Sequence, residues 1–245
     1  MCLVVLFHRQ IDGFPVVLGA NREEAYSRSS LSPHWIAGHT VFAGKDERAG
    51  GTWFGINRHG LSVAITNRCG SENADVMRSR GLLCLDSLAF SSSETAVDWV
   101  DGHLQKTTYN PFNLLITDGN DAYVVYGDLS YQVIKLEPGI HVLAETDVDD
   151  LKNPRIVQAF NLLDNGNSSN SSAVVDLLKA VFSRHGDGEK EQEWMCRHMR
   201  DRGTVSSTIL TMSTQVFDGI TYLHTVGPPC SHPYEDLSLV LRENT

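Results

Sequence analysis

Short apolar runs separated by turn residues dominate the start of the chain. Residues 2–7 (CLVVLF) and 15–21 (PVVLGAN) are rich in β-branched and aliphatic side chains, and the segment between them contains the turn pair Asp12-Gly13. This pattern predicts a β-hairpin whose first strand begins at the start of the chain.

A second hairpin and several later strands follow from the same pattern. Residues 51–57 and 61–67 flank a tight turn that contains Gly60, and we expect both hairpins to share one core. Further strand-like runs, bounded by Gly, Asp, Asn or Ser, occupy residues 112–118, 122–128, 131–136, 206–212, 220–226 and 237–241. The first three of these runs are spaced as in an antiparallel meander.

Helical periodicity lies between these groups of strands. Apolar residues between 76 and 104 are spaced as in two short helices interrupted near residues 91–93, and residues 155–163 and 173–182 also show helical spacing. The polar segment 164–172 between the last two is typical of a solvated loop. Strands followed by helices, and then by more strands and helices, predict a layered α+β fold rather than alternating βαβ units.

Length and charge narrow the classes of function. The chain has 245 residues, of which 41% are hydrophobic, so we expect one domain over residues 1–245. It carries 20 Lys and Arg against 30 Asp and Glu, a formal charge of −10. The average field therefore repels phosphate backbones and anionic lipid headgroups, and we expect no nucleic-acid partner.

The N-terminal segment and the cysteines indicate a reducing compartment. The first apolar run is too short to span a bilayer, and it lacks the basic region and the small-residue cleavage site of a signal peptide. The five cysteines form no CxxC pair and suit free thiols better than a disulfide framework; they are Cys2, Cys69, Cys84, Cys196 and Cys230. We expect a cytoplasmic protein that does not insert into membranes.

Cys2 is the first candidate for chemistry. If Met1 is removed, Cys2 carries a thiol and a free α-amine. Such an amine, with a pKa of about 7.7–8.0 in peptides, can accept the thiol proton as the sulfur attacks a carbonyl. With Met1 attached, the nitrogen is an amide and cannot act as a base. The alternative is that Cys2 is only a small buried side chain in a strand.

The end of the second strand is expected to bring a cation near this thiol. In a hairpin, the end of strand two returns to the start of strand one, so Arg22 in the sequence Asn21-Arg22-Glu23-Glu24 should lie beside Cys2. A guanidinium there stabilises a thiolate and can bind a substrate carboxylate or carbonyl. In the alternative interpretation, Asn21 caps a short helix with Glu24 at its third position.

Asn67 ends the second strand of the second hairpin. Its side-chain amide could donate a hydrogen bond to an oxyanion, and the glycines earlier in the hairpin allow close approach of the backbone. Alternatively, Trp53 and Phe54 pack this hairpin and Asn67 merely begins a loop.

These motifs together resemble the NRDE family, also called the transport and Golgi organisation family. MC at the start, ANREE, GGTWFGINRHGLSVAITN, NPFNLLITDG and RGTVSSTIL follow one another in the order and spacing of that family and cover most of the chain. The resemblance implies a four-layer αββα sandwich of the N-terminal nucleophile hydrolase type, with two mainly antiparallel sheets flanked by helices. In such enzymes an N-terminal Cys, Ser or Thr attacks an amide.

The resemblance also implies roles for individual residues. Cys2 corresponds to the nucleophile, Arg22 to the activating or binding arginine and Asn67 to an oxyanion donor. The residues expected to contact a bound molecule around them are Asn21, Glu23, Glu24 and Trp53.

The chain departs from the family pattern in three places. Glu23 stands where the family has Asp, Glu145-Thr146 stands where related acylases have a second Asn, and Val205 replaces a usual Arg. Loss of one oxyanion donor costs about 100- to 1000-fold in turnover. The departures therefore indicate machinery that is weakened or aimed at a different substrate.

Two Cys-x-His pairs do not by themselves predict a metal site. In a helix, Cys196 and His198 point to different faces. Cys230 and His232 follow Pro228-Pro229, which predicts a loop, and they supply fewer ligands than a closed zinc site needs. We expect no metal site and no resident cofactor.

Two classes of function remain open at this stage. The first is a cysteine amidohydrolase that acts on a non-peptide C–N amide bond through a thioester on Cys2. The second is a non-catalytic binding or trafficking protein for a small or hydrophobic ligand, including haem, with which the family is associated; Cys2 or a histidine would then be an axial ligand. A silent fold in which Cys2 is only core is the third alternative. The sequence specifies neither the substrate nor the oligomeric state.

Overall fold

Two antiparallel sheets form the centre of the computed structural model, which describes residues 2–38, 40–70, 77–128, 130–186 and 193–243. The first sheet contains, in spatial order, β10 (Gly139–Leu143), β1 (Leu3–Ile11), β2 (Phe14–Ala25), β11 (Arg202–Ser213), β12 (Val216–Val226) and β13 (Glu235–Asp236). The second contains β3 (Ser30–Ile36), β4 (Val41–Asp46), β5 (Phe54–Asn57), β6 (Ser62–Asn67), β7 (Phe112–Thr117), β8 (Ala122–Gly127) and β9 (Tyr131–Leu136).

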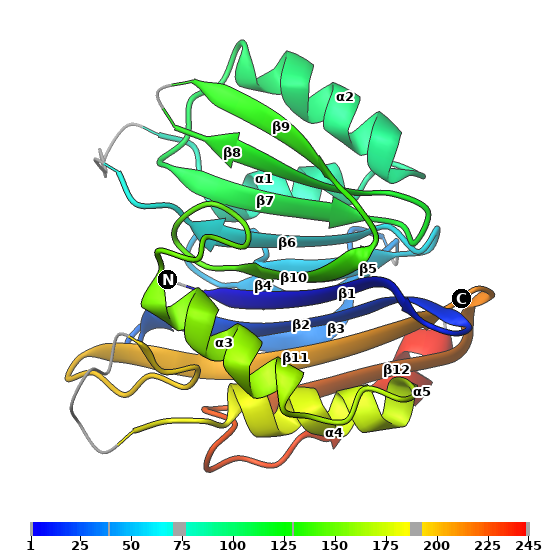
Figure 1. Ribbon diagram of the computed structural model, residues 1–245. Helices are drawn as coiled ribbons and strands as arrows, with labels where there is room; N and C mark the ends of the chain where they lie inside the picture. The colour runs from blue at the N-terminus through cyan, green and yellow to red at the C-terminus, as the bar shows by residue number, and fades with distance from the viewer. Residues whose placement is uncertain (1, 39, 71–76, 129, 187–192, 244–245) are drawn as a thin grey trace.

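The sheets are the two inner layers of a four-layer sandwich (Figure 1). Their facing sides bury one apolar core, to which Leu18, Phe42 and Tyr222 contribute. A second core lies under α3 (Pro154–Asp164) and α4 (Ser171–Phe182) on the outer face of the first sheet. A third lies under α1 (Arg80–Ser87) and α2 (Ser93–Leu104) on the outer face of the second sheet. The predicted αββα arrangement is confirmed.

Strand β1 lies inside the first sheet, between β10 and β2. Its side chains alternate between the two cores: Leu3 and Val5 face α3 and α4, whereas Val4 and Leu6 face the other sheet. The prediction of an interior N-terminal strand is therefore correct. The same alternation directs Cys2, which precedes β1, toward the space between the sheets.

Three of the described helices begin at a short polar side chain that caps them. Ser92, Asn153 and Asn170 precede α2, α3 and α4 and accept hydrogen bonds from backbone N–H groups of the first turn. The helices predicted from periodicity are therefore present, with boundaries set by these caps. Within the described residues, no helix combines the length and the apolar character that crossing a bilayer requires.

Three expectations from the sequence were wrong or incomplete. Residues 237–241 do not form a strand: α5 (Ser238–Arg242) occupies them, with Ser238 and Leu241 buried and Leu239 exposed, which is a helical rather than an alternating pattern. Strand β2 continues to Ala25, so Asn21 caps no helix. The edge strand β3 and its neighbour β4 were not predicted; β3 has few buried side chains, so its residues show no clear alternation.

Candidate active site

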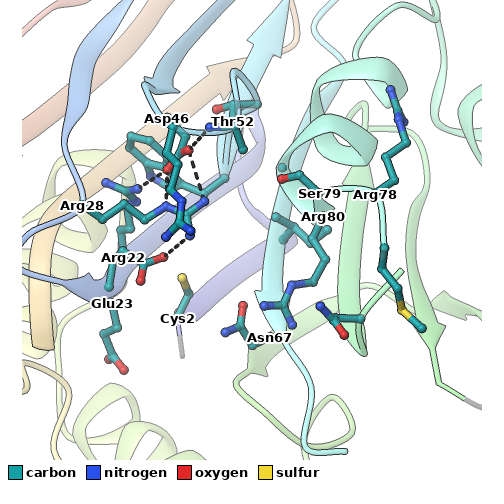
Figure 2. Close-up of a pocket in the computed structure, with 18 residues that line it drawn as sticks. Cys2, Arg22, Glu23, Arg28, Asp46, Thr52, Asn67, Arg78, Ser79 and Arg80 are labelled. Atoms are coloured by element: carbon teal, nitrogen blue, oxygen red, sulfur yellow. Dashed lines mark hydrogen bonds and ion pairs between the residues drawn. The ribbon is translucent and has the colours of Figure 1, made fainter. Parts of the chain in front are cut away.

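A cavity of about 420 Å³ opens where the N-terminus, β2, the β4–β5 loop, the end of β6 and the start of α1 meet. Figure 2 shows the thiol of Cys2 between Arg22 on one wall and Asn67 on the other. All three residues line this cavity. The structure thus brings together the three side chains for which the sequence suggested a chemical role.

Strand pairing explains why Cys2 and Arg22 are neighbours. Leu3 pairs with Asn21 in the β1–β2 ladder, so continuing that register by one residue sets Cys2 opposite Arg22. Cys2 is 9% exposed, so its side chain is largely shielded from solvent at the bottom of the cavity.

Arg22 is fixed from three directions. Its guanidinium donates to Asp46 Oδ2 at 3.0 Å and to Ser30 Oγ at 2.7 Å, and it lies 4.0 Å from the ring centroid of Trp53. Burial lowers the pKa of Arg22, while its electrostatic interactions with the Cys2 and Asp46 side chains oppose that shift. The result is a cation with little rotational freedom directed at the space around the thiol.

Asp46 is the anion that organises this wall. It accepts hydrogen bonds from the Arg28 side chain at 2.7 and 3.1 Å and from the Ala49 backbone N–H at 2.7 Å, in addition to Arg22. Burial alone would raise the pKa of Asp46, but the hydrogen bonds from Arg28 and Ala49 outweigh it and lower that pKa. Asp46 therefore stays ionised between two guanidinium groups.

The opposite wall combines Asn67 with the N-terminal end of α1. Asn67 is the last residue of β6 and pairs with Phe112 of β7, which sets its side chain at the mouth of the cavity. Arg80 begins α1 and donates to the Pro111 carbonyl at 2.8 Å. Arg78 forms an ion pair with Asp86 at 2.7 Å. Both arginines line the cavity.

The predicted binding residues divide between the two faces of β2. Glu24 lines the cavity and pairs with Arg28 at 3.6 Å, and Trp53 lines it beneath Arg22. The side-chain amide of Asn21 lies on the other face, donating to the carbonyls of Phe182 and Met195 at 3.0 and 2.9 Å, and Asn21 does not line the cavity.

Glu23 borders the cavity, yet its carboxylate also lies on the helix-covered face. It forms buried ion pairs there with Arg155 and with Arg197, the second at 3.2 Å. The alternation of β2 therefore makes Arg22 the side chain of this motif that faces the thiol, and gives Asn21 and Glu23 a supporting position behind it.

Sequence reasoning missed several members of the site. Asp46 is the last residue of β4 and Arg28 lies in the loop between β2 and β3, and neither stands in a distinctive motif; Arg78 and Arg80 lie just before and at the start of α1. The only signal was local: the run Met77-Arg78-Ser79-Arg80 concentrates positive charge in a strongly acidic chain.

Comparison with known proteins identifies the family. A family model described as Transport and Golgi organisation 2 matches residues 1–218. The chain belongs to this family. The homologues of Transport and Golgi organisation protein 2 from human and mouse are 32% and 31% identical to it over 149 residues, which is 54% of this chain. The chain spans about half the length, 51%, of these curated relatives. The resemblance inferred from the motifs is confirmed.

Solved structures share the fold of this family member at low sequence identity. Penicillin V acylase from Agrobacterium tumefaciens superimposes with a TM-score of 0.60 at 12% identity, covering 100% of this chain and 89% of that one. A conjugated bile acid hydrolase from Clostridium perfringens, with its second residue changed from cysteine to alanine, gives 0.59 at 13% identity, covering 98% and 93%. The N-acylethanolamine-hydrolyzing acid amidase orthologue from Caenorhabditis elegans gives 0.55 at 14%, covering 85% and 92%. These likenesses establish an N-terminal nucleophile hydrolase fold.

Of the departures from the pattern of the Transport and Golgi organisation family, only Glu23 lines the cavity. Glu145, Thr146 and Val205 are not among the described residues that line it. Near them, the Asn113 side chain donates to the carbonyls of Ala144 and Thr146 at 2.9 and 3.0 Å. Asn113 therefore stabilises the turn after β10 and is not aimed at the cavity as an additional amide donor.

Proposed function

We propose that this protein is a cysteine amidohydrolase that cleaves a non-peptide C–N amide bond. The observation that carries the proposal is the convergence of Cys2, Arg22 and Asn67 on one cavity of about 420 Å³. The fold shared with amide-cleaving enzymes and the family membership support it. The proposal requires removal of Met1, because only then does Cys2 carry a free α-amine.

The chemistry follows from the groups around the thiol. The α-amine of Cys2 accepts the thiol proton as the sulfur attacks the amide carbonyl, which gives a tetrahedral intermediate. Collapse of this intermediate breaks the C–N bond, the leaving amine takes the proton, and the acyl group remains as a thioester on Cys2. Water, activated by the same amine, then hydrolyses the thioester and releases a carboxylic acid.

Arg22 and Asn67 have separate roles in this scheme. The Arg22 guanidinium stabilises the thiolate and binds an oxygen of the substrate, since Asp46, Ser30 and Trp53 hold it beside the sulfur. The side-chain amide of Asn67 donates to the carbonyl oxygen as negative charge develops on it. One such donor contributes about 100- to 1000-fold to turnover.

The charge of the cavity indicates the substrate class. Although the whole chain carries −10, the residues that line the cavity include more basic than acidic side chains: Arg22, Arg28, Arg48, Arg78 and Arg80 against Glu23, Glu24 and Asp46. Arginine side chains bind carboxylate and phosphate groups in a bidentate geometry. We therefore propose an acyl or amine portion that carries an anionic group near the scissile amide.

Covalent labelling tests the proposal. Protein whose mass shows loss of Met1 is incubated with a thiol-directed amide or lactam analogue, and the modified residue is located by peptide mass spectrometry. We expect labelling at Cys2 that is lost in Cys2→Ala and retained in Cys69→Ser, an exposed cysteine elsewhere. The melting temperature of Cys2→Ala should stay nearly unchanged, because a nucleophile contributes function rather than core volume. Processed wild type that is folded but unlabelled at Cys2 would contradict the proposal.

A non-catalytic ligand carrier is the second candidate. It is favoured by one observation: Glu145-Thr146 stands where related acylases have a second Asn and Val205 stands where the family has Arg, while the cavity beside Cys2 is lined by arginines. The two carboxylates of a haem would suit such a cavity, with Cys2 as an axial thiolate. Haem titration separates the two functions. Soret-band binding that is lost in Cys2→Ala, together with no covalent labelling of wild type, would favour the carrier.

A further inference from the structure

Two cysteines and a histidine meet on the other side of the first sheet, outside the set of residues that line the cavity. The Sγ atoms of Cys196 and Cys230 are 3.5 Å apart, and His198 Nε2 lies 3.6 Å from the first and 3.1 Å from the second. Cys196 is buried, Cys230 is half-buried and His198 is exposed. Three ligand atoms from two distant segments thus converge at one point that solvent can reach.

The local backbone explains this convergence, which the sequence did not predict. Residues 196–198 are not helical: the Cys196 N–H donates to the Arg184 carbonyl at 2.9 Å, and His198 forms an antiparallel bridge with Gly203. Cys196 Sγ and His198 Nε2 are 3.6 Å apart, so both side chains point to one side of this segment. The expectation that they diverge on a helix was wrong.

The second segment is a tight loop that supplies the third ligand atom. The N–H groups of Ser231 and His232 both donate to the Pro228 carbonyl, at 3.1 and 3.0 Å. This turn starts at Pro228, contains Pro229, and holds Cys230 against residues 196–198. His232 turns instead toward Ser231 and the Pro228 carbonyl, so the cluster takes its histidine from the Cys196 segment.

We propose that Cys196, His198 and Cys230 bind a thiophilic divalent ion of the Zn²⁺ class. Zinc takes thiolate sulfur at about 2.3 Å and imidazole nitrogen at about 2.0–2.1 Å in tetrahedral geometry, which separates two thiolates by about 3.8 Å. The observed Sγ–Sγ distance of 3.5 Å and the two S–N distances of 3.6 and 3.1 Å match that arrangement within a few tenths of an ångström. Binding converts two thiols to thiolates and releases their two protons to solvent.

The fourth coordination position faces outward. His185 packs edge-on against His198 with 5.3 Å between the ring centroids, and it is exposed. A water molecule or this imidazole completes the tetrahedron. Three ligands are then fixed by the protein fold, and the fourth can exchange.

The ion would brace the strand that carries Arg22. Arg197, between two of the ligands, forms a buried ion pair with Glu23 at 3.2 Å, and the Met195 carbonyl accepts from Asn21 at 2.9 Å. Asn21 and Glu23 flank Arg22 in β2. Holding residues 195–198 to the loop at Cys230 therefore fixes the face of β2 opposite the cavity.

Metal analysis of the full chain tests this site without any assay of activity. Protein purified under reducing conditions, without an affinity tag, is loaded with Zn²⁺, freed of excess ion and measured for metal content. We expect one ion per chain in wild type and in Cys69→Ser, and a loss of at least about tenfold in affinity in Cys230→Ser, as removal of one ligand predicts. Cys230 is half-buried, so this variant should keep the fold.

Spectroscopy with Co²⁺ identifies the ligands. Cobalt bound by thiolates gives an intense sulfur-to-metal charge-transfer absorption, which should appear in wild type, weaken in Cys230→Ser and Cys196→Ser, and persist in Cys69→Ser and Cys2→Ala. Zn²⁺ should also raise the melting temperature of wild type more than that of Cys230→Ser. Absence of stoichiometric binding to the reduced wild type, or binding that Cys230→Ser leaves unchanged, would overturn the proposal. An intact mass that shows an intramolecular Cys196–Cys230 disulfide in protein from the native host would overturn it as well.

Discussion

At the cavity wall, one carboxylate holds two guanidinium groups in place. Asp46 pairs with Arg22 at 3.0 Å and with Arg28 at 2.7 Å, and both Asp46 and Arg22 have side chains less than a tenth exposed. Isolated buried charges are costly, and the removal of one partner leaves the other uncompensated. The position of Arg22 beside the thiol therefore depends on Asp46.

We predict that Asp46→Asn lowers the free energy of unfolding by about 3 kcal/mol, because it leaves buried Arg22 without its anion while Arg28, which is partly exposed, can rehydrate. The matched control is Asp176→Asn. Asp176 pairs with Lys179 at 3.2 Å, but its side chain is 74% exposed, so the change should stay within about 0.5 kcal/mol. Denaturant unfolding measures both. Equal effects of the two substitutions would show that buried Arg22 does not depend on Asp46.

A buried histidine behind Arg22 gives the molecule a pH-dependent stability. His224 of β12 is 4% exposed and shares a hydrogen bond with Thr208 Oγ1 at 2.9 Å. Burial, helped by the positive charge of Arg22, lowers its pKa from 6.5 to about 4. As the pH falls from 6.5 toward 4, the unfolded chain therefore binds the proton first, and the native state loses stability.

The size of this effect follows from linkage. A depression of this kind corresponds to at most roughly 3 kcal/mol, present above pH 6.5 and lost as the pH falls through the folded-state value. We predict that His224→Gln reduces the slope of unfolding free energy against pH in this window, since Gln does not titrate. The difference between the two curves removes the contributions of the other titrating groups, because both proteins share them. Parallel curves for the two proteins would show that His224 is not the group responsible.

At the scale of secondary-structure elements, one side of the cavity is set by a close contact between the backbones of the β4–β5 loop and α1. A Cβ atom on Gly51 would lie 2.2 Å from the Gly81 carbonyl carbon and 2.4 Å from its oxygen. The Thr52 N–H also donates to the Gly81 carbonyl at 2.9 Å. The β4–β5 loop thus touches the first turn of α1, and this contact sets the position of Arg80 across the cavity from Arg22.

We predict that Gly51→Ala destabilises the protein by about 1–3 kcal/mol, because neither backbone can move aside without shifting α1. It should also slow labelling of Cys2, since Arg80 moves with the helix. The control is Gly102→Ala in α2, where a Cβ meets nothing within 4 Å. That change should stabilise the protein by about 0.5–1 kcal/mol, because Ala has a higher helix propensity than Gly. Thermal unfolding and labelling rates measure both; a neutral Gly51→Ala would contradict the close contact.

The elements that could be predicted from the sequence are those in which apolar and polar side chains alternate with a clear strand or helix period. Both early hairpins and the four longer helices follow from periodicity, and the register of the first hairpin alone sets Arg22 opposite Cys2. Strand β3 has too few buried side chains to produce a pattern. The run 237–241 is short enough for strand and helix to look alike until burial of Leu241 decides between them.

The remainder of the site depends on packing between layers, which no local pattern encodes. Asp46 meets Arg22 because the two sheets stack, and Arg80 faces both because α1 abuts the β4–β5 loop. The cluster of Cys196, His198 and Cys230 likewise depends on a non-helical backbone where a helix was expected. Long-range contacts of this kind are visible only in the folded molecule.

At the scale of the whole molecule, the net charge of the chain and the charge of the cavity lining differ in sign. The chain carries −10, whereas arginines outnumber acidic residues among those that line the cavity; the proposed binding of an anionic group therefore depends on this local charge and not on the average field. We propose that Cys2, at the bottom of this cavity, acts as a nucleophile through its own α-amine. Every step of the proposed reaction depends on that amine being free.

The intact mass of the protein from its native host tests this claim most directly. We predict a mass lower than that of the full sequence by one methionine residue, with no acetyl group, so that Cys2 is the N-terminal residue. A mass that retains Met1, or that includes an acetylated N-terminus, would contradict it, because the nitrogen of Cys2 would then be an amide or blocked and could not take the thiol proton.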